Sequence, residues 1–236
     1  MLALSSGVYI KIIASDDAMK TNAISSMVKY LEENQDIDFA TCNGIKVTED
    51  QHYPNFESNL LVYETKPNLS SNQLFEKVAR HNEIFAPGAI VRRSVYDKYG
   101  WYDEDIKIED LEYWLRILKD GNVKVGFIDD KLIYYRISQQ SMTSMVNNNR
   151  LAQRRRTFHN AVIQIYKKHQ DGFHRDIFVQ VVSKKILDEI YFAKGNNLKE
   201  FENELRKEFK VFVSKTPMSI TNRIYYTLKY LKTKFK

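Results

Sequence analysis

The sequence predicts an α/β domain over residues 1–147, followed by a helical region over residues 148–236. Strand-like, helical and strand-like apolar patterns follow one another at residues 9–14, 23–33 and 37–42. This order is typical of a βαβ-type unit, which places strands in a sheet with a helix packed on it. Beyond residue 148 the strand-like runs end, and helical spacing predicts helices at residues 150–168, 175–193, 198–213 and 219–235.

Shorter elements complete the α/β domain. Apolar runs predict strands at residues 89–91, 123–128 and 132–135, and helical spacing predicts short helices at residues 74–80 and 94–99. We expect Ser94 to cap the second of these helices and Gly100 to end it. Residues 43–71 are polar and loosely patterned, which predicts loops and short edge pieces. The clearest helix spans residues 110–120, with Leu111, Trp114, Leu115 and Leu118 on one face.

Charge, cysteine content and apolar runs limit the binding partners and the cellular setting that we expect. The net charge of +6 favours an anionic partner, and the basic excess lies at the C-terminus, because residues 211–236 hold six Lys or Arg and no acidic residue. The single cysteine, Cys42, excludes an internal disulfide and a Cys-based zinc site, and favours a cytoplasmic setting. No secretory signal is recognisable in residues 1–8, and no apolar run approaches the roughly 20 residues needed to span a bilayer.

The last predicted helix combines an apolar stripe with basic residues. Ile220, Ile224, Leu228 and Leu231 share one face, and Arg223, Lys229, Lys232 and Lys234 lie largely off it. Residues 216–236 therefore suit an interfacial helix on the anionic inner face of the cell membrane. The alternative is a helix packed on the α/β domain with a basic outer face. Nucleic acid is not expected as a partner, because the aromatic residues follow core spacing and do not alternate with Lys and Arg.

Two pairs of carboxylates stand where chemistry is expected. Asp16 and Asp17 end the first strand, and ligands of α/β sheets gather at the carboxyl ends of strands. Such a pair can hold Mg²⁺ or Mn²⁺ together with substrate phosphates, or it can simply form a strand-to-helix turn with Asp17 as cap. Glu109 and Asp110 open the clearest helix, where a carboxylate can act as general base or can complement the helix dipole.

Four segments, taken together and in order, resemble the family 2 glycosyltransferases. Residues 6–17 (SGVYIKIIASDD) are similar to the family pattern G-x-Y-I-x-x-(L)-D-x-D-D. Residues 87–96 and 99–104 are similar to the G-x-x-x-x-R-R and G-x-(F)-D-E stretches, and residues 109–116 (EDLEYWLR) to E-D-x-(D)-x-W-L-R-L. Residues 134–137 (YYRI) are similar to the strand that ends the catalytic domain. The resemblance covers residues 2–145.

The resemblance implies a partial GT-A fold, a Rossmann-like mixed sheet flanked by helices, and an inverting transfer of sugar. The donor would be a nucleotide-sugar, and the acceptor a glycan or lipid-linked molecule in bacterial polysaccharide biosynthesis. Asp17 would ligate Mg²⁺ or Mn²⁺, and Asp16 would contact the ribose or the metal shell. Asp110 would be the catalytic base, and the remaining donor- and acceptor-binding residues would be Pro87, Gly88, Glu109 and Arg136.

The chain departs from the family pattern in three places. Ala14 replaces the first acidic residue of D-x-D-D, and Ser138 stands where family members often have His. The family's N-terminal strand, its P-x-Y-N-like turn and a second acidic motif have no counterpart here, so we expect the nucleoside-binding third to be missing and a sheet edge and face to be exposed. The alternative function is therefore a non-catalytic interaction module, or a fragment that complements a separate N-terminal chain.

The missing third leads to a prediction about donor binding. Because the elements that hold the base and ribose have no counterpart, residues 1–236 alone should not bind a nucleotide-sugar tightly. Isothermal titration with UDP-sugars and Mn²⁺ measures this directly. Micromolar binding would refute the expectation.

Overall fold

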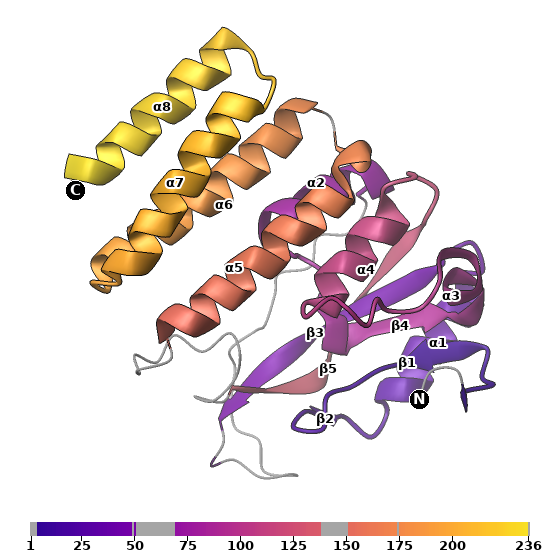
Figure 1. Cartoon of the computed structure of the whole chain (residues 1–236). Coiled ribbons are helices and arrows are strands. Elements are labelled where there is room, and N and C mark those ends of the chain that lie inside the picture. Colours follow the sequence, from indigo (N-terminus) through magenta and orange to yellow (C-terminus); the bar gives the residue numbers. More distant parts are fainter. Residues whose placement is uncertain (1–3, 49, 51–68, 138–150, 174, 236) are drawn as a thin grey trace. The chain divides into compact units, whose positions relative to one another are not determined.

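The computed structural model describes residues 4–48, 50, 69–137, 151–173 and 175–235 (Figure 1). The chain divides into two compact units. Unit 1 comprises Met1–Asp105 and Glu109–Ser144, and unit 2 comprises Ile106–Ile108 and Met145–Lys236. The predicted domain boundary between residues 147 and 148 lies outside the described residues, as do most of the residues predicted as loops between 43 and 71.

A mixed sheet forms the centre of unit 1. Its described strands are β1 (Tyr9–Lys11), β2 (Ala18–Met19), β3 (Phe39–Thr48), β4 (Ala89–Arg92) and β5 (Val125–Ile137). They are ordered β1-β4-β3-β5-β2, with β3 and β5 parallel and with β4 antiparallel to both β1 and β3. Strands β1, β3 and β5 therefore run in one direction. The α/β prediction is confirmed, and so is the helical C-terminal region described below.

The strands differ from the prediction in length. β3 continues to Thr48, through residues predicted as loop, because it stays paired with β5 along its whole length. The two strands predicted at residues 123–128 and 132–135 are one strand, β5. A register irregularity around Asn43 accommodates the extra residues of β5. Bulges of this kind bend a strand without ending its pairing, so the polar residues at the bend looked like a break in the sequence.

The described part of unit 1 also contains four α-helices and a short 3-10 helix. They are α1 (Ala23–Glu33), α2 (Ser71–His81), α3 (Arg93–Tyr99), α4 (Glu109–Leu118) and the 3-10 helix η2 (Ala86–Gly88). Helix α2 begins with a capping box between Ser70 and Gln73. Helix α3 begins one residue earlier than predicted, with Arg92 in the N-cap position, so the expected Ser94 cap is wrong. Gly100 ends α3 as predicted, at a φ of 80° that favours glycine.

Both faces of the sheet are covered. Met27 and Leu31 of α1 are fully buried in a cluster with Ala40 and Cys42 of β3. The alternate residue Phe39 stacks on Trp114 of α4, with ring centroids 5.0 Å apart. Since successive side chains of a strand point to opposite faces, α1 and α4 lie on opposite sides of β3.

The expected exposure of the sheet is seen only in part. β1 is a terminal strand of the described sheet, bonded to β4 on one side only. Its central residue Ile10 is nevertheless buried, as are Ile90 and Val91 of β4, so the expectation of an exposed apolar face is wrong. The large apolar side chain that is exposed at this edge is Val8, immediately before β1.

A half-buried arginine, Arg116, joins α4 to the loop after α3. The Arg116 guanidinium donates to the carbonyl oxygens of Tyr99 and Trp101 and pairs with Glu112, whose side chain is fully buried. A Cβ at Gly100 would meet the same guanidinium at 3.3 Å. The residues of the predicted G-x-(F)-D-E and W-L-R motifs thus contact one another, and the contact holds the first turn of α4 in place.

Unit 2 consists of α5 (Leu151–Lys168), the 3-10 helix η3 (Gln170–Gly172), α6 (Arg175–Gly195), α7 (Lys199–Lys215) and α8 (Ile220–Phe235). These α-helices match the four predicted ones to within two residues at each described end. The arginines of α5 form ion pairs within the unit: Arg155 with buried Glu189 and Arg156 with Glu204. None of the described helices is both long and apolar enough to cross a bilayer.

The Arg116 contacts predict a large loss of stability on truncation. Arg116→Ala takes the cation away from buried Glu112 and removes the donor to the Tyr99 and Trp101 carbonyls. Removing one partner of a buried ion pair costs about 3 kcal/mol or more of unfolding free energy. Urea unfolding measures the change. Lys124→Ala is the matched control, because the Lys124–Asp36 pair is largely exposed and should contribute little. Equal effects of the two changes would contradict the interpretation.

Candidate functional site

The predicted site residues of the first half meet at one edge of the sheet. The carboxyl ends of β1, β3 and β5 lie at this edge, because the three strands run in the same direction. β4 is antiparallel to them, so the 3-10 turn that precedes it, which holds Pro87 and Gly88, lies at the same edge. Asp16 and Asp17 follow β1, and Arg136 is near the end of β5. Ligands of open α/β sheets bind at such an edge.

Arg136 holds the aspartate turn against β5. Its backbone N–H donates to Oδ1 of Asp17 at 2.9 Å, and its guanidinium donates to the backbone oxygen of Asp16 at 2.9 Å. The same guanidinium donates to the carbonyl of Thr48, the last residue of β3, at 2.8 Å. Arg136 thus ties the ends of β3 and β5 to the aspartate turn. These bonds give Arg136 a positioning role, and its expected contact with donor or acceptor stays a prediction.

Asp17 has an oxygen that no donor in the described part of the chain satisfies. Its side chain is half-buried, and among the described residues no hydrogen-bond donor reaches its buried Oδ2 atom. Burial, and to a lesser degree the neighbouring charge of Asp16, raises the pKa of Asp17 to about 6. A buried carboxylate oxygen without a partner is costly, and a cation or a substrate group would remove that cost.

These features fit a Mg²⁺ or Mn²⁺ ion. Both ions take hard oxygen ligands, and Asp17 offers a free oxygen with the exposed side chain of Asp16 next to it in the chain. Among the described residues no group of three or more His, Cys, Asp or Glu converges on one point. A cation held here would therefore use one or two protein carboxylates and take its other ligands from phosphate and water, as Mg²⁺ commonly does.

Lys11 connects the end of β1 to the Pro87–Gly88 turn. Its ammonium donates to the carbonyl oxygens of Pro87 and Ile12. Burial lowers the pKa of Lys11 to about 8, although the charge of Asp17 acts in the opposite direction. The composition and motif patterns did not single out this lysine, because it occupies a variable position of its motif and its partner is 76 residues away in the chain.

Gly88 lies where there is no space for a side chain. A Cβ at this position would come within 2.4 Å of the Cys42 carbonyl oxygen and 2.7 Å of the Phe85 ring. The turn is also fixed by the Thr41 hydroxyl, which donates to the Phe85 carbonyl at 3.1 Å. Gly88 is therefore required for close packing of the turn on β3, and Pro87 is half-buried beside it.

Asp110 is held by an asparagine that precedes the same turn. Nδ2 of Asn82 donates to Oδ2 of Asp110 at 3.1 Å, and the Leu111 backbone N–H donates to Oδ1 at 2.7 Å. Asn82 ends α2 in the left-handed region at a φ of 48°, which asparagine tolerates better than most residues. Its own Oδ1 atom is buried and has no partner among the described residues. Burial raises the pKa of Asp110, and the Asn82 hydrogen bond opposes this shift.

The predicted residues thus fall into two groups. Asp16, Asp17, Arg136, Pro87 and Gly88 are gathered at the sheet edge, with Lys11 added by the structure. Asp110 lies at the start of α4 and is joined to the first group through the segment from Asn82 to Pro87. Glu109, also predicted, is exposed at the first position of α4. Asn82 could have been suspected from the sequence, because it follows a predicted helix where a left-handed cap residue is common.

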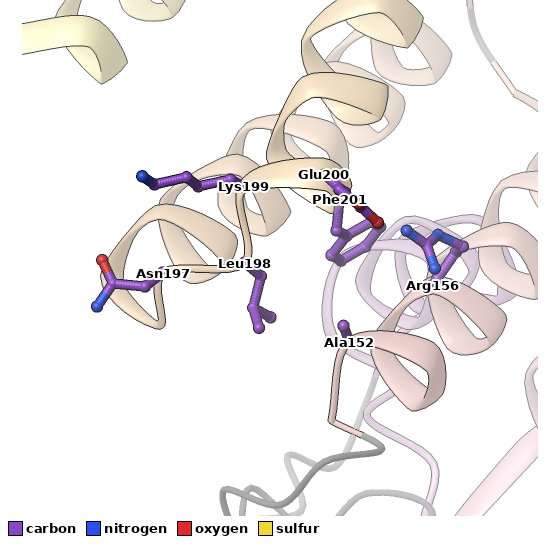
Figure 2. A pocket seen from close by; sticks show the side chains of 7 residues that line it. All are labelled: Ala152, Arg156, Asn197, Leu198, Lys199, Glu200 and Phe201. Atoms are coloured by element: carbon purple, nitrogen blue, oxygen red, sulfur yellow. The ribbon is translucent and has the colours of Figure 1, made fainter.

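A pocket of unit 2 holds none of these residues. It has a volume of about 350 Å³ and lies between α5 and the start of α7 (Figure 2). Its lining comprises Ala152, Arg156, Asn197, Leu198, Lys199, Glu200 and Phe201. Arg156 is already paired with Glu204, and the Phe201 ring is buried, so the pocket offers little unsatisfied chemistry.

The raised pKa of Asp110 predicts a pH-dependent stability. The unfolded chain releases this proton near the ordinary pKa of 3.8, and the folded chain releases it at higher pH. Ionisation of Asp110 therefore destabilises the fold increasingly as pH rises from 3.8 through the raised pKa. Asp110→Asn removes this cost, so its melting temperature relative to wild type should rise as the pH increases above 3.8.

Thermal unfolding followed by circular dichroism measures the difference. Asp129→Asn is the control, because Asp129 is an exposed carboxylate of the same unit. A relative melting temperature of Asp110→Asn that stays constant with pH, or that changes as it does in the control, would contradict the burial of Asp110.

Comparisons with known proteins bear on the fold. No family model matches the chain, and no curated protein matches its sequence. Among solved structures the chain is similar to S. aureus TarS 1-349, which was crystallised in complex with UDP-GlcNAc. The TM-score is 0.54 at 13% identity, and the match covers 98% of this chain and 67% of that chain. At this identity the likeness shows a shared fold, and the expected partial GT-A-like α/β fold with a helical C-terminal region is confirmed.

Proposed function

We propose that this chain is a family 2 glycosyltransferase that moves a sugar from a nucleotide-sugar to a glycan or lipid-linked acceptor with inversion. The observation that carries the proposal is the aspartate turn. Arg136 fixes it at the carboxyl edge of the sheet, and one oxygen of Asp17 is left without a partner among the described residues. The fold shared with a protein solved in complex with UDP-GlcNAc supports a nucleotide-sugar as donor.

The donor side would be built from the aspartate turn. Asp17, with Asp16, would hold Mg²⁺ or Mn²⁺, which supplies charge neutralisation for the leaving nucleoside diphosphate. Asp16 is exposed and free to contact the ribose or the metal shell. Arg136 keeps the aspartate turn in position from the end of β5, and Lys11, at the end of β1, holds the Pro87–Gly88 turn beside it.

The acceptor side would be built from Asp110. Direct displacement at the anomeric carbon needs a base that takes the acceptor hydroxyl proton, and a pKa raised by burial makes Asp110 a better proton acceptor than an exposed aspartate. Asn82 fixes the Asp110 carboxylate, and its unpartnered Oδ1 atom can accept a hydrogen bond from a substrate hydroxyl. Pro87 and Gly88 would line the cleft, and Glu109 would shape the acceptor end.

A second candidate function is favoured by β1, the strand at one side of the described sheet. Among the described strands β1 is bonded to β4 alone, and the exposed Val8 precedes it. An unpaired strand edge can add a strand from another chain. The chain would then act as an interaction module, or would complete a site together with a separate N-terminal chain.

Ligand-observed NMR tests the proposed donor site, since it detects weak binding. We expect UDP to show saturation transfer from the protein that increases with Mg²⁺. Asp17→Asn should abolish the Mg²⁺-dependent part, because it removes the charged oxygen that would hold the ion. Asp129→Asn is the matched control on β5 and should behave as wild type. UDP binding that is absent, or independent of both Mg²⁺ and Asp17, would argue against the transferase.

A further inference from the structure

The last helix has two apolar faces, and only one of them is used inside unit 2. Tyr226, Tyr230 and Thr233 are buried, at 5%, 6% and 0% exposure. The Tyr230 ring stacks on Phe209 of α7 at 5.1 Å, and Arg206 of α7 donates to the Thr233 hydroxyl at 2.7 Å. This inner face secures α8 to its own unit. The packing of α8 is therefore complete without its opposite face.

The outer face of α8 is apolar and exposed. Its residues recur three or four positions apart, so they form one stripe. Their exposed fractions are 78% for Ile220, 55% for Ile224, 55% for Leu228 and 39% for Leu231. Within unit 2, the exposed side of α8 is therefore apolar at its centre, with basic residues beside the stripe. A continuous apolar stripe of this kind marks an interaction surface.

The charge beside the stripe indicates what covers it. Lys229 and Lys232 are exposed on α8, and Lys229 extends over the Tyr225 ring at 4.5 Å. Residues 211–236 contain no acidic side chain. A second copy of the chain docked through this face about a two-fold axis would bring lysines toward lysines. An anionic lipid surface instead meets both the apolar stripe and the positive charge.

We propose that α8 binds the surface of an anionic membrane, with its outer face among the lipid chains and with Lys229 and Lys232 on the headgroups. At 16 residues, α8 is shorter than the roughly 20 needed to span a bilayer, so it lies in the plane of the interface. The inference goes beyond the proposed transfer activity and does not require it. A membrane-bound chain would meet a lipid-linked acceptor within that surface.

Vesicle flotation of the whole chain tests the proposal. We expect the protein to float with vesicles of phosphatidylcholine and phosphatidylglycerol, and to float far less with phosphatidylcholine alone. Ile224→Asn with Leu228→Asn keeps the net charge and should weaken partitioning more than about tenfold, because two inserted side chains are lost. Lys229→Glu with Lys232→Glu should weaken it by roughly 25-fold or more on the anionic vesicles, since each lysine contributes about fivefold.

Matched controls separate membrane binding from misfolding and self-association. Ile24→Asn changes an isoleucine of α1 that is 42% exposed, and it should float like wild type. Circular dichroism confirms that each variant is folded. Equal flotation of the Ile224/Leu228 double variant and wild type would overturn the proposal. So would a wild-type dimer, seen by light scattering, that does not float and that this double variant makes monomeric.

Discussion

The parallel pairing of β3 with β5 is the constraint on which the rest of unit 1 depends. It runs from Phe39 and Val125 to Thr48 and Ile137 and carries both strands to the same edge. At that edge Arg136 bonds to the end of β3 and to both residues of the aspartate turn. If the ladder were shorter, Arg136 would not reach the turn, and Asp17 would lose the bond that orients its carboxylate.

The motifs that carry the resemblance divide into those that build the fold and those that offer chemistry. Gly100, Trp114 and Arg116 carry the most specific part of the resemblance, yet their contacts are with buried protein groups. Their effect on function is indirect, because they place the first turn of α4 and hence Asp110. Asp17 and Asn82 lie at the candidate site, and each keeps a buried acceptor oxygen without a partner among the described residues; the Trp114 Nε1 donor also lacks one there, but it belongs to the core. Unsatisfied groups of this kind are costly in a purely structural role.

Local patterns predicted the helices and most strands because burial periodicity is a local signal. Three predicted features meet at one end of the sheet: the Asp16–Asp17 turn, the Pro87–Gly88 turn and Arg136. They meet there because β1, β3 and β5 run in the same direction and β4 runs in the opposite one. Lys11 and Asn82 were missed because their roles arise from contacts across 76 and 28 residues. The length of β3 was missed for a similar reason, since its second half mixes polar and apolar residues and is held by pairing with β5. The outer face of α8 was visible as a stripe, but only the structure shows that the opposite face completes the packing.

In the proposed donor site, Asp17 is the protein ligand of a divalent cation that also binds the nucleoside diphosphate. Crystals of the chain grown with Mn²⁺ and UDP, with anomalous diffraction recorded at the manganese edge, test this directly. We expect one strong manganese peak within coordination distance of Oδ2 of Asp17, with diphosphate oxygens completing the coordination shell of the ion. A manganese peak at other residues, with UDP bound and Asp17 unchanged, would contradict it.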